Sequence, residues 1–176
     1  PRPCDTARPS SDLVLPHQLG RLLDVLVLET VRDAHRHRVA DVTVVGVHAL
    51  GHGPDDLYPD ALRSIDGLKD RGYRVAITAN QPARRHAELE ALGVRVEVMA
   101  MSDAMGVWKP DPAFFARTLE LLGSPQPADV AYVGDRVDND VLPSAAAGMR
   151  AVWIRRGPWG LLHEDRDGTA HLVVRS

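Results

Sequence analysis

Short apolar runs alternate with helical patterns along most of this chain, and that alternation constrains the fold more than any other feature. Runs suited to buried strands stand at 42–47, 74–78, 94–99, 130–134 and 151–154. Helical patterns lie between them at 59–71, 83–92, 111–122 and 140–147. A glycine follows each helical pattern, as is common just beyond a helix end. Strand–helix alternation with short connections predicts an α/β fold, a Rossmann-like parallel sheet with helices on both faces.

The length of 176 residues suits one domain with a sizeable core. Residues 1–12, rich in Pro, Ser and Arg, predict a loose N-terminal tail, and residues 13–176 a single α/β domain. Apolar positions at helical spacing predict a helix over 16–38, ahead of a core at about 42–160. From Gly157 onward we expect a loop, with one more short strand at 171–174.

Composition excludes several classes of protein. The hydrophobic content of 44% argues against disorder over most of the chain, and the net charge of −3 gives no reason to expect nucleic acid or a membrane as partner. No apolar run approaches the roughly 20 residues that span a bilayer, and no signal-peptide pattern is visible. The single cysteine, Cys4, excludes an internal disulfide. The expectation is a soluble cytoplasmic protein.

Acidic side chains crowd the loop that follows the run at 130–134. Gly134 and Asp135 end that run, and Asp138, Asn139 and Asp140 follow. Carboxylate and amide oxygens are the ligands that Mg²⁺ prefers, and ligands of open α/β sheets lie at the carboxyl ends of strands. The other interpretation is a solvated turn in which Asp or Asn caps the next helix.

Two further segments carry groups that suit a phosphate. Thr78 ends its strand and is followed by Ala79 and Asn80, so that a hydroxyl and backbone N–H groups at the next helix start can hold an anion. A plain helix cap is the alternative for Thr78. Lys109, one of only two lysines, stands in a loop stiffened by Pro110 and Pro112. Its ammonium could neutralise a phosphate, and the alternative is an exposed lysine in a turn.

In this order and spacing the three segments resemble the haloacid dehalogenase superfamily over about residues 42–160. The stretches 145–150 and 155–157 resemble it as well. The resemblance implies a Rossmann-like parallel sheet and, in most members, Mg²⁺-dependent phosphoryl transfer through an aspartyl-phosphate. It also implies roles for individual residues: phosphate binding for Thr78, Ala79, Asn80 and Lys109, and metal binding for Asp135, with Asp140 or Asp138 in support.

The first motif of that family departs from its pattern in this chain. It should read Asp-x-Asp-x-Thr after the first strand, but Gly46, His48 and Leu50 stand there. Glycine has no side chain with which to form a covalent intermediate. No catalytic residue is therefore predicted at Gly46 and His48, and Mg²⁺ binding is expected to be weak or absent. Substitute nucleophiles to consider are Asp24, Asp55 and Asp56, and His48 with His52 could bind a transition metal.

The sequence leaves more than one function open. The short interval between Gly46 and Thr78 leaves little or no room for a cap domain, and an open site suits large substrates or a partner protein. The leading hypothesis is a catalytically impaired phosphatase relative that binds a small phosphorylated molecule or a protein partner. The alternative is an active Mg²⁺-dependent phosphohydrolase with an unrecognised nucleophile. A purely structural role is the third hypothesis.

Overall fold

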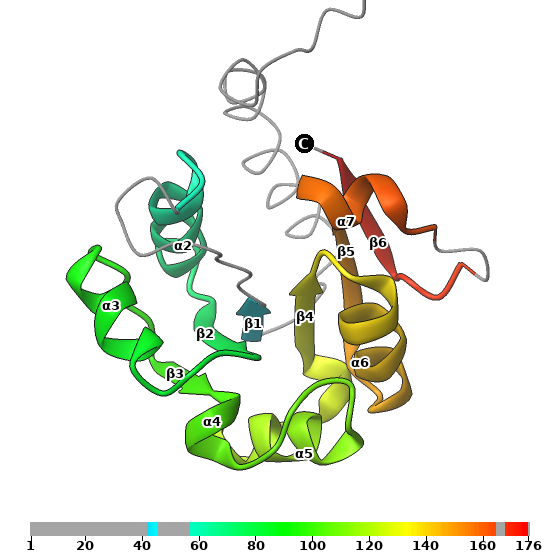
Figure 1. The fold of residues 1–176 in the computed structure, drawn as a ribbon, viewed down its shortest axis with the longest axis horizontal. Coiled ribbons are helices and arrows are strands. Elements are labelled where there is room, and N and C mark those ends of the chain that lie inside the picture. The colour runs from blue at the N-terminus through cyan, green and yellow to red at the C-terminus, as the bar shows by residue number, and fades with distance from the viewer. Residues whose placement is uncertain (1–41, 46–56, 165–167, 176) are drawn as a thin grey trace, which may run out of the picture.

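The computed structural model describes residues 42–45, 57–164 and 168–175, and these residues form a parallel sheet flanked by helices (Figure 1). The strands of the sheet run in the order β3-β2-β1-β4-β5-β6, and each neighbouring pair is parallel. Their bounds are Val42–Val45 for β1, Arg74–Ala79 for β2, Val98–Met101 for β3, Val130–Gly134 for β4, Arg150–Arg155 for β5 and Leu172–Arg175 for β6. The predicted α/β fold with a parallel sheet is confirmed.

The direction of strand addition reverses at β1. From β1 the chain adds β2 and β3 on one side and then returns to add β4, β5 and β6 on the other. Ligands of open α/β sheets bind in the crevice that such a reversal leaves at the carboxyl ends of the strands. Val45 of β1 is level with Ile77 and Val133, so Thr78 and Gly134 each lie one residue further toward that edge. The fold thus brings the ends of β2 and β4 to the same edge, as predicted.

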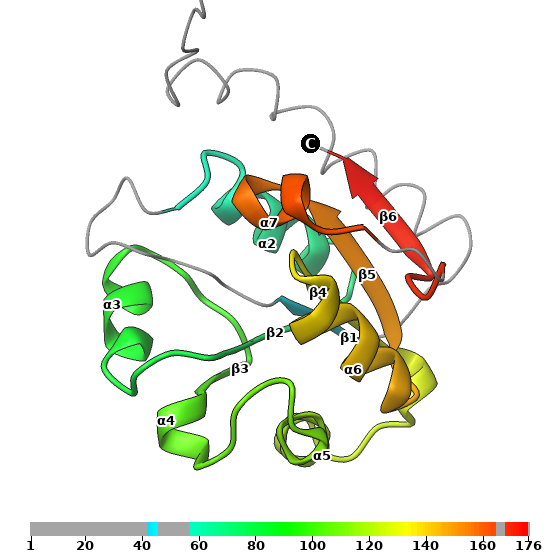
Figure 2. The ribbon, with the colours of Figure 1, turned by 45° about the vertical axis from the view of Figure 1, so that its right-hand side comes forward.

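Helices cover both faces of the sheet (Figure 2). On one face, Ile65 of α2 and Leu89 of α3 pack with Val75 and Ile77 of β2. On the other face, side chains of α5 pack with Ala76 and Tyr132, and the loop before α6 packs with β5. These helices are α2 at Ala61–Lys69, α3 at Arg85–Ala91, α5 at Pro112–Leu121 and α6 at Leu142–Ala146. Over the described ranges, no helix is long and apolar enough to cross a bilayer.

Shorter helical segments complete the described chain. They are α4 at Ser102–Met105, a 3-10 turn at Pro127–Asp129, a π-helical turn at Val137–Val141 and α7 at Gly157–Leu162. Three predictions need correction here. The strand predicted at 94–99 pairs with β2 only over 98–101. The helix predicted at 140–147 is α-helical only over 142–146, after the π-helical turn. The loop predicted from Gly157 contains α7.

β3 begins at Val98, four residues after the predicted strand start, and the contacts of Val94 explain the difference. The Val94 N–H donates to the carbonyl of Leu89 and closes the end of α3, and the Val94 side chain is buried in the core beside that helix. An apolar run therefore marks burial, but does not show where strand pairing begins. The predicted tail at 1–12, the helix at 16–38 and the residues Gly46 and His48 lie outside the described residues.

Candidate functional site

A buried ion pair lies at the carboxyl edge of the sheet. Lys109 Nζ donates to Asp140 Oδ1 at 2.6 Å, and both side chains are only 2% exposed. The ammonium also lies 5.8 Å from the ring centroid of Phe114 and 5.7 Å from that of Tyr132. Lys109 is therefore a buried cation in a partly aromatic environment, and the alternative of an exposed lysine in a turn was wrong.

Lys109 keeps its charge in this environment. Burial alone lowers the pKa of the ammonium, but the neighbouring Tyr132 oxygen and the Asp140 carboxylate raise it by more, and the net pKa lies above its ordinary value. Burial has the opposite effect on Tyr132: it raises the pKa of the phenol, which is therefore neutral near pH 7. The negative charge beside the Lys109 ammonium is then the carboxylate of Asp140.

Asn80 fixes the backbone of Lys109. The Asn80 Nδ2 group donates to the Lys109 carbonyl at 2.9 Å, and the Lys109 N–H donates to Asn80 Oδ1 at 2.8 Å. The carboxamide thereby joins the end of β2 to the loop before α5. Asp111 caps α5 by accepting from the Ala113 N–H, which fixes the other end of the loop. Asn80 was predicted as a phosphate ligand; in the structure its side chain positions Lys109, and a direct phosphate contact stays a prediction.

Thr78 and Lys109 approach the same buried hydroxyl. The Thr78 side chain is buried, and the Thr118 hydroxyl lies 3.5 Å from its Oγ1. The Tyr132 hydroxyl is buried without a hydrogen-bond partner among the described residues. Burial raises the pKa of this phenol, while the Lys109 ammonium and the Thr78 hydroxyl act in the opposite direction. Sequence reasoning missed Tyr132, because an aromatic residue within an apolar strand reads as core.

Asp140 uses both of its carboxylate oxygens. Oδ1 accepts from Lys109 Nζ, and Oδ2 accepts from the Arg136 N–H at 3.1 Å. The close approach of this side chain explains Gly134, because a Cβ added there would lie 2.3 Å from the Asp140 Cβ. The loop after β4 therefore folds tightly over the end of its own strand.

Asp138 belongs to a separate, more exposed group. Its carboxylate accepts two hydrogen bonds from the Arg136 guanidinium at 3.0 and 2.6 Å, and this pairing lowers the pKa of Asp138. The guanidinium also lies 4.4 Å from the ring centroid of Trp159 in α7. Asp138 is thus held within its own loop, whereas Asp140 also pairs with Lys109 of the loop before α5. Asp135, whose carbonyl accepts from Trp153 Nε1 at 3.1 Å, precedes them at the end of β4.

Comparison with known proteins identifies the family. The model for haloacid dehalogenase-like hydrolases matches residues 15–148, which is more than half of the chain. The chain belongs to the haloacid dehalogenase-like hydrolase family. A glyceraldehyde 3-phosphate phosphatase from Methanopyrus kandleri is 31% identical over 142 residues, covering 79% of this chain and 60% of the relative. A phosphoserine phosphatase from Thermus thermophilus is 33% identical over 121 residues, covering 67% and 47%.

A solved haloacid dehalogenase-family structure agrees with the fold. The crystal structure of a phosphatase of this family from Thermococcus onnurineus superposes with a TM-score of 0.60 at 29% identity, covering 70% of this chain and 56% of the other. The chain spans about half to three-fifths of the length of the two curated relatives described above. Their names therefore give a class of chemistry to test for this chain, and they do not assign its substrate.

Haloacid dehalogenase relatives generally use Mg²⁺, and the described residues allow a test of fit. Within the described residues, no group of three or more His, Cys, Asp or Glu side chains could hold a metal ion. Asp140, predicted with Asp135 as a metal ligand, is engaged by Lys109 and the Arg136 N–H. The described part of the site thus does not fit a magnesium ion by itself, and we derive no step through one. The roles predicted for Asp135 and Asp140 at a metal stay predictions.

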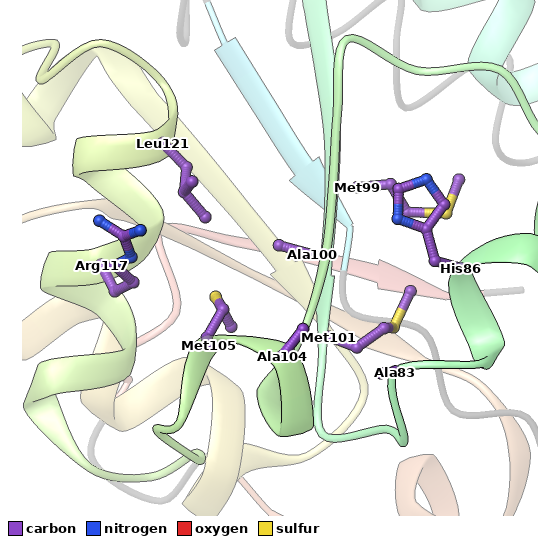
Figure 3. A pocket seen from close by; sticks show the side chains of 9 residues that line it. All are labelled: Ala83, His86, Met99, Ala100, Met101, Ala104, Met105, Arg117 and Leu121. Atoms are coloured by element: carbon purple, nitrogen blue, oxygen red, sulfur yellow. The ribbon is translucent and has the colours of Figure 1, made fainter.

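Two hollows lie near the carboxyl edge of β3. One, of about 210 Å³, is lined by residues of β3, α4, α5 and the α3 segment, among them His86, Met99 and Arg117 (Figure 3). None of the predicted site residues lines it. The other hollow has a volume of about 320 Å³, and Asn80 and Trp108 are among the residues that line it. Only the second adjoins the Lys109 site.

Proposed function

We propose that this haloacid dehalogenase-like protein binds a small phosphorylated molecule at the carboxyl edge of its sheet, with phosphatase turnover lost or strongly reduced. The observation that carries the proposal is the buried ammonium of Lys109, which lies with Thr78 around one buried hydroxyl. A fully buried lysine is rare unless it is paired, and Lys109 is paired with Asp140. Asp140 neutralises the ammonium in this structure, and a bound phosphate would compete with Asp140 for the donor hydrogens of Lys109.

Each residue has a definite part in that binding. Lys109 supplies a positive charge and donor hydrogens to the phosphate oxygens, and Asn80 holds the backbone that aims it. Thr78, Ala79 and Asn80 supply a hydroxyl and N–H groups at the end of β2. The Tyr132 hydroxyl offers one more donor at the edge of the same site. These groups suit the recognition of a phosphate, but none of them is the carboxylate nucleophile that forms an aspartyl-phosphate.

The reduced turnover follows from the sequence beyond β1. Gly46 and His48 stand where the family places its nucleophilic and its acid/base aspartate. A histidine acting as general acid contributes only about 10²–10⁴-fold. Without a carboxylate to attack phosphorus, that contribution gives no covalent route.

The test is hydrolysis of 4-nitrophenyl phosphate by the purified chain with Mg²⁺. We expect little or no activity from the wild type, and a gain of Mg²⁺-dependent activity from the double variant Gly46→Asp with His48→Asp. Adding Asp135→Ala to that double variant should remove the gain. The control for binding is sulfate, which should raise the melting temperature of the wild type and leave Lys109→Ala unchanged.

The phosphatases among the relatives favour a second candidate, an active phosphohydrolase. Robust Mg²⁺-dependent hydrolysis by the wild type that Asp135→Ala abolishes would establish it and overturn the proposal of impaired catalysis. Asp55, Asp56 and Asp24 would then be replaced one at a time by Asn to find the nucleophile.

A further inference from the structure

An exposed tryptophan stands directly before the buried lysine. Trp108 is 52% exposed, whereas Lys109 is only 6% exposed. Single exposed apolar residues are common on protein surfaces and by themselves indicate nothing. The surroundings of Trp108 are what distinguish it, because its ring borders the hollow of about 320 Å³ that begins at Asn80.

The peptide group that joins Trp108 to Lys109 is held by two hydrogen bonds. Its carbonyl accepts from the Asp111 N–H at 2.9 Å, and the next N–H along the chain, that of Lys109, donates to Asn80 Oδ1. The loop that carries the indole is therefore ordered on the C-terminal side of Trp108.

Both apolar and polar residues line the hollow. Trp108 and Pro82 supply the apolar surfaces, and the remaining lining residues are Asn80, Gln81, Ser102 and Asp103. The polar groups of Ser102 and Asp103 already contact the backbone, since the Gln81 N–H donates to Ser102 Oγ and the Ala83 N–H donates to Asp103 Oδ2. A ligand in this hollow would contact the Trp108 side chain together with several polar groups that can orient it.

The hollow lies at a suitable distance from the proposed phosphate position. Thr78 and Asn80 are two residues apart at the end of a strand, a span of about 7 Å. That span matches a phosphate monoester whose phosphorus lies beside Thr78 and Lys109 and whose organic group extends over Trp108. Indole faces bind flat, unsaturated rings more favourably than they bind saturated groups of the same size.

We propose that Trp108 is a specificity-determining residue that selects phosphate monoesters with a planar ring near the phosphate. This inference rests on the proposed phosphate binding and extends it to a ligand class. Stacking of this kind is expected to strengthen binding about three- to tenfold over a saturated ring.

The test is titration calorimetry of the full chain with three phosphonates, which resist hydrolysis because they carry a P–C bond. Phenylphosphonate presents a planar ring, cyclohexylphosphonate a saturated ring of similar size, and methylphosphonate only the head group. The wild type should bind phenylphosphonate about three- to tenfold more tightly than cyclohexylphosphonate. Trp108→Ala should remove that preference and leave methylphosphonate affinity unchanged, while Trp108→Phe should keep most of the preference. Val173→Ala, an exposed apolar residue on β6 at the other edge of the sheet, is the matched control and should behave as wild type.

The outcomes separate this inference from the function on which it rests. Equal affinity of the wild type for the two ring compounds, or a preference that survives in Trp108→Ala, overturns the role of Trp108 while phosphate binding stands. Failure of all three phosphonates to bind the wild type overturns the proposed function and this inference with it.

Discussion

Lys109 and Asp140 form an ion pair of 2.6 Å that joins the loop before α5 to the loop after β4. The two residues are 31 positions apart in the chain, and each side chain is almost completely buried. The contact places a cation at the carboxyl edge of the sheet and fixes its orientation. It also makes the phosphate site depend on two separate segments, so that each can be tested by substitution.

Replacing one residue of this ion pair should lower the free energy of unfolding more than replacing both residues does. Asp140→Asn leaves the Lys109 ammonium buried without its counter-charge, and we expect a loss of about 3–5 kcal/mol in the free energy of unfolding. The double variant Lys109→Met with Asp140→Leu replaces the pair by apolar groups. Its free energy of unfolding should fall by less than that of Asp140→Asn. Urea unfolding of the single and double variants measures both. A double variant that is less stable than Asp140→Asn would contradict the role of the pair.

Asn80→Ala should weaken both the fold and anion binding. The substitution leaves the N–H and the carbonyl of Lys109 without their partner, which costs about 1–3 kcal/mol. The sulfate-dependent rise in melting temperature should shrink, because the ammonium is aimed less well. Gln81→Ala is the neighbouring control, since Gln81 contacts Ser102 through its backbone atoms. Equal behaviour of the two variants would show that Asn80 does not position Lys109.

Gly134→Ala tests the close approach of the loop to its own strand. The added Cβ would lie 2.3 Å from the Asp140 Cβ, and the backbone must move to relieve the clash. We expect a loss of about 1–3 kcal/mol, together with weaker sulfate binding as Asp140 moves away from Lys109. At Gly72, where φ is +84° and nothing lies within 4 Å of an added Cβ, Gly72→Ala reports backbone strain alone and should leave sulfate binding intact. Normal sulfate binding by Gly134→Ala would refute this prediction.

The dependence of stability on pH should report the buried ammonium. The pKa of Lys109 is raised in the folded state, so its contribution is fully present below the ordinary lysine pKa of about 10.4 and is lost as pH rises through the higher folded value. The stability difference between the wild type and Lys109→Met should therefore be constant from neutral pH to about pH 10 and then fall.

Thermal unfolding from pH 7 to 11 measures this difference. Sulfate is a suitable ligand for a parallel titration because its own charge is constant over that range, and its binding should weaken in the same alkaline window. Lys109→Arg keeps a cation throughout and is the matched control. A stability difference that already falls between pH 7 and 9 would show that the ammonium is not held by Asp140.

The alternation of strands and helices was predictable from local patterns in the chain. Apolar runs, helical spacing and terminal glycines are local signals, and a parallel sheet brings the carboxyl ends of its strands to one edge. On these signals and the family resemblance, Thr78, Lys109 and Asp135 were predicted to share one site, and their joint role in binding a phosphate or a metal stays a prediction. The start of β3 at Val98 was not predictable in this way, because Val94 is as apolar as the strand residues but closes α3.

The contacts between those groups could not be predicted from local patterns, because they depend on how distant segments pack. The pairing of Lys109 with Asp140 and the hydrogen bonds between Asn80 and the Lys109 backbone each join segments that are distant in the chain. The same packing leaves Trp108 exposed beside a hollow while it buries the next residue. The position of a residue along its strand determines the face and the edge of the sheet on which its side chain lies. The partner of a buried charge depends on long-range packing, because the energetic cost of leaving that charge unpaired selects the arrangement in which the two groups meet.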